Sequence, residues 1–388
     1  MRRRPILVAG LAAPALAADP WAGLAELCHE AMRARLTPDG APCLLRSWDA
    51  GMEGDFARTH RETAYVYDNA LAGLAFLAMG DAGSARRIGL ALALAQDADR
   101  HFRDGRLRNA YVAGPATARL PGWWDAATSR WVEDGYQVGT ATGVVAWAVL
   151  LWLALDETLR EPPFRAAARR AADWVAVTQR GERGFRGGFI GHEPDPAPLG
   201  WVSTEHNIDL VAAFGRLGRR EEAAHAAAFV DSMWDASERR YLAGLTPEGA
   251  PNRFSALDAN LWPLIARGMP PARRGALDWV RARHAAGDGF DFNDDRDGAW
   301  TEGTAIAALA LRMAGEDGAA ARAGGFLRRQ VSAAGLLYAT DVPSLSTGLS
   351  TGIDPTRPDF RYPRHPHLAP TAWAVLAARL ANPFARLT

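Results

Sequence analysis

The chain has 388 residues, of which 48% are hydrophobic and 23% are charged, so it is long and apolar enough to bury a large core. Its 44 basic and 44 acidic side chains cancel, and this balance does not indicate a nucleic-acid partner. Every basic side chain other than histidine is arginine, which excludes a lysine-bearing phosphate loop and a lysine Schiff base, and with the latter pyridoxal phosphate enzymes.

The N-terminus predicts a segment that is removed from the mature protein. Three arginines at positions 2–4 precede a short apolar stretch, residues 6–16, with small residues at its end. We therefore predict a signal peptide over residues 1–18, a single domain over residues 19–388, and a periplasmic or secreted location. No stable membrane span is expected, because this stretch and the apolar run 144–155 are both too short.

Export bears on the two cysteines. An oxidising compartment permits a disulfide between Cys28, on an apolar helix face, and Cys43, in a loop. Two separately buried thiols are the alternative, and both interpretations stay open.

Two kinds of helix alternate along the chain, six of each. Amphipathic helices with arginines on one side are expected to face solvent. They are predicted at Trp21–Leu36, Asp81–Phe102, Phe164–Gln179, Arg220–Trp234, Pro271–His284 and Gly318–Val331. Helices that are apolar nearly all round are expected to be buried. They are predicted at Thr63–Met79, Thr140–Asp156, Thr204–Leu217, Ala259–Arg267, Thr301–Met313 and Pro370–Leu380.

The connections between these helices alternate as well. Each buried helix leads to the next solvent-facing helix by a short turn, whereas the return connection is a long loop rich in glycine and aromatic residues. Loops this long in a compact domain are usually functional, and all of them lie at the end that holds the N-termini of the buried helices. Short strands are possible in these loops, for instance at Gly184–Ile190. Six helical hairpins repeating about every 60 residues predict a closed ring, in which Pro263 must lie near the start of the fourth buried helix or kink it.

Three of the buried helices begin with acidic residues. In the segment Trp201–Leu210, Ser203 or Thr204 is the predicted N-cap, Glu205 falls in the first turn, and Asp209 lies on the same face one turn later. Carboxylates at the mouth of an apolar helix are costly to bury, which indicates a function. The alternative is that Glu205 only interacts with the helix dipole.

The tripeptides Tyr67-Asp68-Asn69 and Thr301-Glu302-Gly303, together with the segment Ser203–Asp209, open buried helices. This pattern resembles the six-hairpin glycosidase superfamily over essentially the whole mature chain. The resemblance implies an all-α (α/α)6 barrel with an active-site cleft at the end carrying the long loops. It also implies glycoside hydrolysis by two carboxylic acids, with inversion in most members. The same barrel supports polysaccharide lyases and sugar epimerases, and a non-catalytic glycan-binding or assembly protein is a further alternative.

Glycoside hydrolysis needs one carboxylic acid to protonate the leaving oxygen and a second carboxylate to activate water or attack the sugar. Asp68, Glu205 and Glu302 are the candidates, because they lie on three helices at the same end of the ring. We predict Glu205 as the acid and Glu302 or Asp68 as the base, since a helix dipole favours an ionised group in the first turn. Asp209 is predicted to raise the pKa of Glu205 or to be the raised acid itself. No cofactor is expected.

Other side chains near the same end are predicted to contact a carbohydrate substrate. These residues are Tyr67, Trp123, Trp124, Trp201, His206, Trp300, Asp291 and His367. Sugar rings stack on aromatic faces, and the Trp123-Trp124 pair is the preferred platform because it follows a proline and a glycine in a loop. The alternative is that these aromatic residues fill loop cores. In a lyase or epimerase, His206, His365 or His367 would instead be the base.

The loop from Asp291 to Glu302 partly matches a calcium-binding EF-hand. Asp291, Asn293, Asp295 and Glu302 fall at ligand positions, but the position that needs glycine holds Arg296. We therefore expect no metal, and instead a solvated acidic loop or one that binds sugar hydroxyls.

Overall fold

The computed structural model describes residues 19–350 and 360–387. The predicted signal peptide lies outside these residues. All twelve predicted helices are present, two of them with the predicted bounds, and one further helix was not predicted, α2 (Gly54–His60). The prediction of a mostly helical chain is confirmed.

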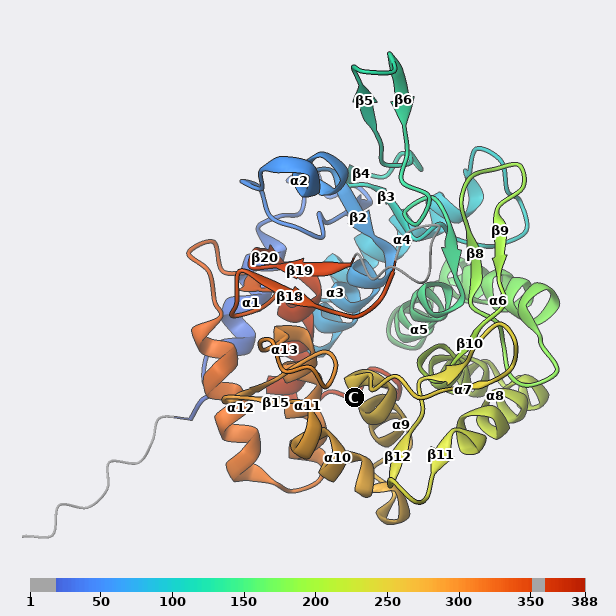
Figure 1. Cartoon of the computed structure of the whole chain (residues 1–388). Coiled ribbons are helices and arrows are strands. Elements are labelled where there is room, and N and C mark those ends of the chain that lie inside the picture. Colours follow the sequence, from blue (N-terminus) through green and yellow to red (C-terminus); the bar gives the residue numbers. More distant parts are fainter. Residues whose placement is uncertain (1–18, 351–359, 388) are drawn as a thin grey trace, which may run out of the picture.

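Six helices contact one another in a cyclic order, each touching the next and the last touching the first. In that order they are α3 (Val66–Ala78), α5 (Thr142–Leu159), α7 (Thr204–Leu217), α9 (Leu257–Ala266), α11 (Thr301–Met313) and α13 (Leu368–Arg379). They surround the centre of the molecule (Figure 1). Most of their side chains are buried, because these helices are largely apolar, although half of the residues of α7 keep some exposure.

Six outer helices cover this ring. They are α1 (Leu24–Arg33), α4 (Ala82–Asp97), α6 (Pro162–Trp174, continued by a π-helical turn at Val175–Gln179), α8 (Arg220–Ser232), α10 (Gly275–Arg283, after a 3-10 turn at Pro271–Arg273) and α12 (Asp317–Arg329). Helices α4, α6, α8, α10 and α12 each pack on the inner helix just before them in the chain. The exception is α1, which packs on α13, so the first helix contacts the last.

Short antiparallel strands are present in the long loops, and one of them, β8, lies within the segment that was given as an example. They form nine small sheets in the described residues. The pairs are β1 (Cys43–Leu44) with β4 (Gly114–Pro115), β2 (Thr63–Tyr65) with β3 (Ala110–Val112), β5 (Trp123–Asp125) with β6 (Arg130–Val132), β11 (Trp234–Asp235) with β12 (Arg240–Tyr241), β15 (Ala285–Ala286) with β16 (Gly289–Phe290), β17 (Leu337–Tyr338) with β20 (Pro366–His367), and β18 (Ser344–Ser346) with β19 (Arg361–Pro363). The triplets are β7 (Thr140–Ala141), β8 (Gly188–Ile190) and β9 (Ala197–Leu199), and β10 (Val202–Ser203), β13 (Gly244–Leu245) and β14 (Pro251–Asn252).

One polar side chain anchors the start of each of five inner helices. At the fourth helical position, Asn69, Asn207, Asn260, Thr304 or Thr371 accepts a hydrogen bond from a backbone N–H of the segment that follows the preceding outer helix. The same side chain also donates to the carbonyl four residues earlier. Because each bond satisfies a buried backbone group, the anchors fix the first turns of these helices relative to the loops.

Helix α7 shows how local sequence sets the boundaries of an inner helix. Ser203 is the N-cap, as predicted, and its hydroxyl accepts from the backbone N–H of Glu205 at 3.0 Å. The helix ends at Gly218, which has the left-handed conformation (φ 79°) that glycine adopts without strain. Glu205 is therefore held in the first turn.

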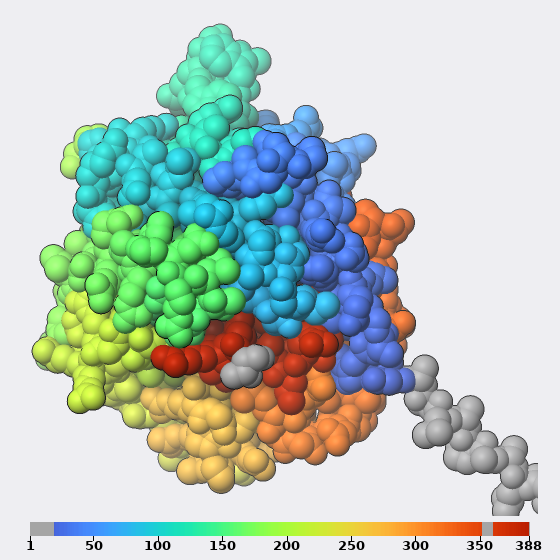
Figure 2. Space-filling view, turned by 180° about the vertical axis from the view of Figure 1, so that it is seen from behind, coloured from blue at the N-terminus to red at the C-terminus, as the bar shows by residue number. Residues whose placement is uncertain are grey.

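An aromatic cluster fills the interior of the ring. Trp147 of α5 packs against Trp262 of α9 and Trp373 of α13, with ring centroids 5.4 Å and 5.8 Å away. Phe384, in the segment after α13, packs against Trp147 at 5.3 Å. This C-terminal segment lies on the face of the molecule turned away in Figure 1, between the surrounding helices (Figure 2). The ring is thus a packed core rather than a channel.

Three smaller predictions meet different outcomes. Helix α9 begins two residues earlier than expected, so Pro263 lies inside it and not near its start. Helix α5 is the one helix in the described residues that is long and apolar enough to span a membrane, but 72% of it is buried in the ring, as a core helix should be.

Cys28 and Cys43 are both buried and free, and burial raises the pKa of Cys28 to about 12. The interpretation as two separate thiols therefore holds in this structure.

Candidate active site

The predicted acids lie in the first turns of inner helices. Asp68 is in α3, Glu205 in α7 and Glu302 in α11. A further acid that the sequence analysis missed, Asp258, is in the first turn of α9. Because these four helices belong to the same ring, their carboxyl groups face a common region, and each of Asp68 and Asp258 raises the pKa of Glu302.

A pattern repeated at the starts of the inner helices would have identified Asp258. In α7, α9 and α11 an acid stands two residues before the anchoring side chain: Glu205 before Asn207, Asp258 before Asn260, and Glu302 before Thr304. The anchors make these positions equivalent in space. Tyr67 has the same position relative to Asn69 in α3.

Glu302 is held by a chain of two hydrogen bonds. The hydroxyl of Tyr67 donates to Glu302 Oε1 at 2.6 Å, and Trp373 Nε1 donates to the Tyr67 oxygen at 3.0 Å. Burial raises the pKa of Glu302 well above its ordinary value, with Asp68 and Asp258 adding to the effect and the Tyr67 hydrogen bond opposing it. Desolvation thus outweighs the helix dipole, which the sequence analysis expected to favour the ionised form.

Asp68 is positioned by a histidine. His367 Nε2 lies 3.0 Å from Asp68 Oδ2, and the imidazole ring stacks on Trp48 with centroids 4.0 Å apart. His367 is buried and its observed contact orients Asp68, whereas the predicted contact with substrate stays a prediction. The contact between His367 and Asp68 therefore links β20 to the first turn of α3.

Glu205 and Asp258 form a carboxyl pair. The two carboxyl groups are hydrogen-bonded to each other, which requires that one of them holds a proton. Burial raises the pKa of both, and for Glu205 the effects of Asp258 and then Asp209 add to it. Glu205 is only partly buried. It therefore has the properties of a proton donor that a substrate can reach.

Asp209 lies behind this pair. Its side chain has no exposed surface. Burial and then Asp258 raise its pKa well above the ordinary value, and a hydrogen bond from Trp147 opposes them. The raised pKa agrees with the prediction that Asp209 is either the raised acid or the group that raises the pKa of Glu205, and its part in catalysis stays a prediction.

The remaining predicted residues divide into exposed and buried ones. Trp201 and His206 are partly exposed beside Glu205, with ring centroids 5.2 Å apart, and burial lowers the pKa of His206 to about 4. A neutral His206 suits hydrogen bonding better than charge pairing. Trp300 and Asp291 are buried, as Asp68 and Glu302 also are, so burial alone does not separate them from the site.

The Trp123-Trp124 pair lies in the hairpin formed by β5 and β6, which projects from the body of the protein (Figure 1, Figure 2). Trp124 is 61% exposed. Its cross-strand partner on β6, Trp131, is 53% exposed. At the base of the hairpin, Trp123 and Trp131 line a hollow of about 320 Å³ together with Arg58 and Arg119. These tryptophans do not fill a loop core.

Two other predicted features do not form a site of the expected kind. Glu302 lies against Tyr67 and not in the Asp291 loop, so the EF-hand pattern is not realised. His365 Nε2 lies 2.9 Å from the carbonyl oxygen of Asp49, whereas His367 bonds Asp68. The candidate histidines His365 and His367 thus have different hydrogen-bond partners.

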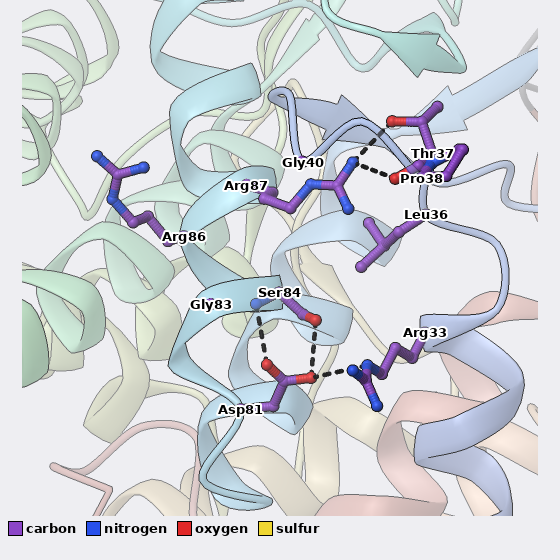
Figure 3. Close-up of a pocket in the computed structure, with 10 residues that line it drawn as sticks. All are labelled: Arg33, Leu36, Thr37, Pro38, Gly40, Asp81, Gly83, Ser84, Arg86 and Arg87. Atoms are coloured by element: carbon purple, nitrogen blue, oxygen red, sulfur yellow. Dashed lines mark hydrogen bonds and ion pairs between the residues drawn. The ribbon is translucent and has the colours of Figure 1, made fainter.

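A larger hollow, of about 500 Å³, lies between the end of α1 and the start of α4 (Figure 3). Asp81 in its wall is the N-cap of α4 and accepts from the backbone N–H of Ser84 at 3.0 Å. Because Asp81 follows the C-terminal end of α3, the hollow lies at the other end of that helix from Asp68. It contains none of the predicted site residues.

Several solved structures that resemble this chain are glycosidases. A glycosidase in complex with glucose superimposes with a TM-score of 0.63 and 15% identity over 94% of this chain and 99% of that one. An α-amylase from Clostridium perfringens gives a TM-score of 0.64 and 8% identity over 92% and 97% of the two chains. The GH63 mannosylglycerate hydrolase from Thermus thermophilus gives a TM-score of 0.58 and 16% identity over 92% and 99%.

The chain has a six-hairpin glycosidase-like fold. No family model matches its sequence, and no curated protein matches it. At this level of identity the likeness concerns the six-hairpin fold alone, so the reaction must be argued from the side chains.

Proposed function

We propose that this chain is an (α/α)6-barrel glycoside hydrolase that cleaves a polysaccharide or oligosaccharide by general acid and base catalysis. The cyclic contacts of the six inner helices support the barrel. The main support for the reaction is the set of four carboxyl groups at the N-termini of α3, α7, α9 and α11, two of which share a proton. Glycosidic bond cleavage needs one protonated carboxyl group and one ionised carboxylate, and this set can supply both.

Glu205 is the proposed acid. Burial and then Asp258 raise its pKa well above the ordinary value, which favours the protonated form that can be given to the leaving oxygen. Asp68 is the proposed base, since a base must be ionised and Glu302, the other candidate, is held in a pKa-raising environment. Glu302 and Tyr67 then bind sugar hydroxyls.

A panel of polysaccharides and oligosaccharides tests this function. We expect new reducing ends without absorbance near 235 nm, the region where unsaturated uronates absorb. Absorbance there would instead identify a polysaccharide lyase, and binding without any product would identify a glycan-binding protein. Either result contradicts the proposal.

The stereochemistry is a separate part of the proposal. Carboxyl groups about 6.5–9.5 Å apart leave room for a water molecule and give inversion, whereas about 5–5.5 Å gives retention. Asp68 and Glu205 belong to inner helices separated by α5, which favours the wider spacing. We expect NMR of the first product to show an anomer opposite to that of the substrate.

The pH dependence follows from the carboxyl pair. Asp258 raises the pKa of Glu205, so Asp258→Asn should lower that pKa and move the alkaline limb of kcat/KM to lower pH. Asp209→Asn should move it less, because Asp209 contributes less to the raised pKa of Glu205. An alkaline limb that stays in place in Asp258→Asn would show that Glu205 is not the titrating acid.

The exposed hairpin should bind substrate without stabilising the fold. We expect Trp124→Ala to weaken polysaccharide binding by about 1 kcal/mol, roughly fivefold, with an unchanged melting temperature. Leu94→Ala is a matched control, because Leu94 is also exposed but lies on the outer helix α4. Equal affinities of the two variants for the polysaccharide would show that the hairpin is not part of the binding surface.

Export is a further part of the proposal. The predicted signal peptide at residues 1–18 would direct the chain to the periplasm or the medium. N-terminal sequencing of protein from each fraction tests this, and an intact N-terminus in the cytoplasm would contradict it.

A further inference from the structure

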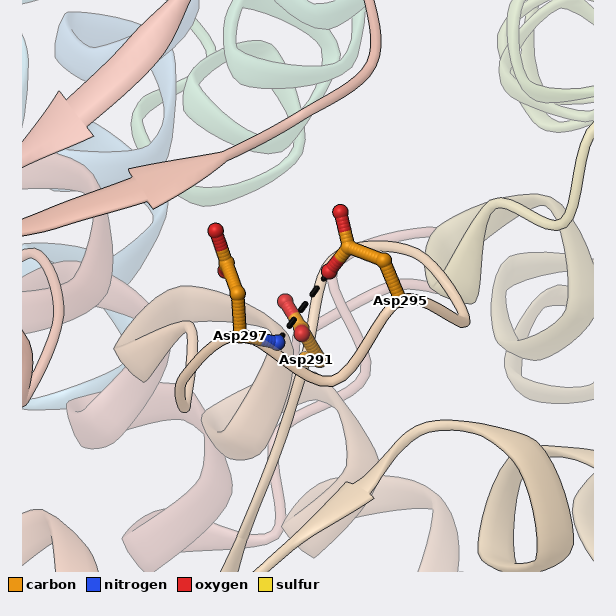
Figure 4. A group of neighbouring side chains, drawn as sticks. All are labelled: Asp291, Asp295 and Asp297. Atoms are coloured by element: carbon orange, nitrogen blue, oxygen red, sulfur yellow. Dashed lines mark hydrogen bonds between the residues drawn. The ribbon is translucent and has the colours of Figure 1, made fainter.

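A second group of carboxylates lies outside the proposed active site. It is in the loop between β16 and α11, where Asp291, Asp295 and Asp297 each place one carboxylate oxygen within 4.8 Å of the others (Figure 4). Asp291 is buried, while Asp295 and Asp297 reach the surface. Like charges at this spacing repel strongly unless something between them compensates.

Asp291 shows that the compensation is incomplete within the protein. Its side chain has no exposed surface, and its Oδ1 accepts from the backbone N–H of Phe292 at 2.6 Å. Its Oδ2 is buried and makes no hydrogen bond of standard geometry in the described residues, although the nearby backbone N–H of Gly298 lowers the pKa of the carboxyl group. A buried carboxylate oxygen without a hydrogen bond of good geometry is costly, so it can accept a further ligand.

Basic side chains compensate only part of the charge. Within the described residues, Asp297 pairs with Arg361, whose Nη2 lies 3.4 Å from Oδ2, and neither Asp291 nor Asp295 has an ion pair. The neighbouring Asp294 pairs with Arg283 at 3.0 Å and is not in the group. The uncompensated charge therefore lies between Asp291 and Asp295.

We propose that Asp291, Asp295 and Asp297 bind a calcium ion. Oxygen ligands select a hard cation, and calcium binds oxygens at about 2.3–2.6 Å, so two of its ligands can lie up to about 5 Å apart. Magnesium binds at about 2.0–2.1 Å, which limits the same spacing to about 4 Å. The three-carboxylate group thus fits calcium better, and its ligands differ from the EF-hand set because Glu302 is not among them.

The position of this group gives the ion a structural role. The backbone N–H of Ser346 donates to Asp297 Oδ2 at 3.0 Å, and its hydroxyl bonds Asp295, so the loop is already tied to β18. The partner strand β19 holds Tyr362, whose ring stacks on Trp300 with centroids 5.8 Å apart. A bound ion would fix β18 and β19 against the residue that precedes α11.

Titration calorimetry on the full chain, stripped with a chelator, tests the site with calcium chloride and magnesium chloride as probes. We expect one calcium per chain, weaker magnesium binding, and a melting temperature that rises with calcium. Asp291→Asn should weaken calcium binding by at least about 10–100-fold. Asp294→Asn, from the same loop, should bind calcium normally. If Asp291→Asn does not fold, Asp297→Asn, which changes a more exposed ligand, gives the same test.

The competing explanation is that Asp291 and Asp295 share a proton. Burial, with Asp295 and Asp297 nearby, raises the pKa of Asp291 to about 7, which permits such a pair near neutral pH. In that case calcium at millimolar concentration would give no heat of binding and would leave the melting temperature unchanged. That result, or calcium binding equal in Asp291→Asn, Asp297→Asn and Asp294→Asn, overturns the proposal.

Discussion

Glu205→Gln is expected to lower kcat by about 10²–10⁴-fold on a substrate identified by the panel, because it removes the proton that is given to the leaving oxygen. Glutamine keeps the shape of the side chain, so KM and the melting temperature should change little. Activity should be recovered on a substrate whose leaving group needs no protonation. Equal losses on both kinds of substrate would indicate that Glu205 has another role.

Asp68→Asn and Glu302→Gln identify the base within the same experiment. We expect a loss of similar size in Asp68→Asn, and a smaller one in Glu302→Gln, since Glu302 is proposed to bind hydroxyl groups with Tyr67. The reverse order would make Glu302 the base. Full activity in Glu205→Gln and in both of these variants would mean that the acids only cap their helices.

Trp373→Ala is expected to cause the largest loss of stability. The side chain is completely buried, contacts Trp147 and Trp262, and donates to Tyr67, so its removal leaves a cavity and takes away one of the two hydrogen bonds of the Tyr67 hydroxyl. Burial of this kind is worth about 3–5 kcal/mol, measurable as a lower denaturation midpoint.

Two variants control this measurement. Trp373→Phe keeps most of the packing and loses the hydrogen bond, so it should destabilise less. Trp124→Ala removes an exposed tryptophan and should leave the midpoint unchanged. A midpoint for Trp373→Ala equal to that of Trp124→Ala would show that the aromatic cluster is not the core of the ring.

Periodicity predicted the helices well, because burial on every face requires an unbroken apolar sequence. The bounds of α11 agree with the prediction for this reason, and those of α7 agree because it has an N-cap serine and a C-terminal glycine. The unpredicted α2 is short and has a single buried residue, so its sequence has no apolar pattern. The many two-residue strands leave no alternating pattern to detect.

The active site was less predictable, because it depends on contacts between distant segments. The acids in α3, α7 and α11 were recognisable as costly charges at the start of apolar helices. The pairing of Glu205 with Asp258, and of Asp68 with His367 across 299 positions, was not. The expectation that the dipole keeps Glu302 ionised failed because a sequence window contains no measure of desolvation.

The contacts of α13 with α1 and α3 have a consequence for how the protein is made. A ribosome adds about 5–20 residues per second, so α13 appears about 15–60 s after α3 is complete. Until then the faces of α1 and α3 that pack on α13 remain exposed, and the ring remains open. The nascent chain cannot finish folding from its N-terminal end, and this exposed apolar surface favours aggregation during synthesis. A truncation that removes α13 would leave the ring open permanently.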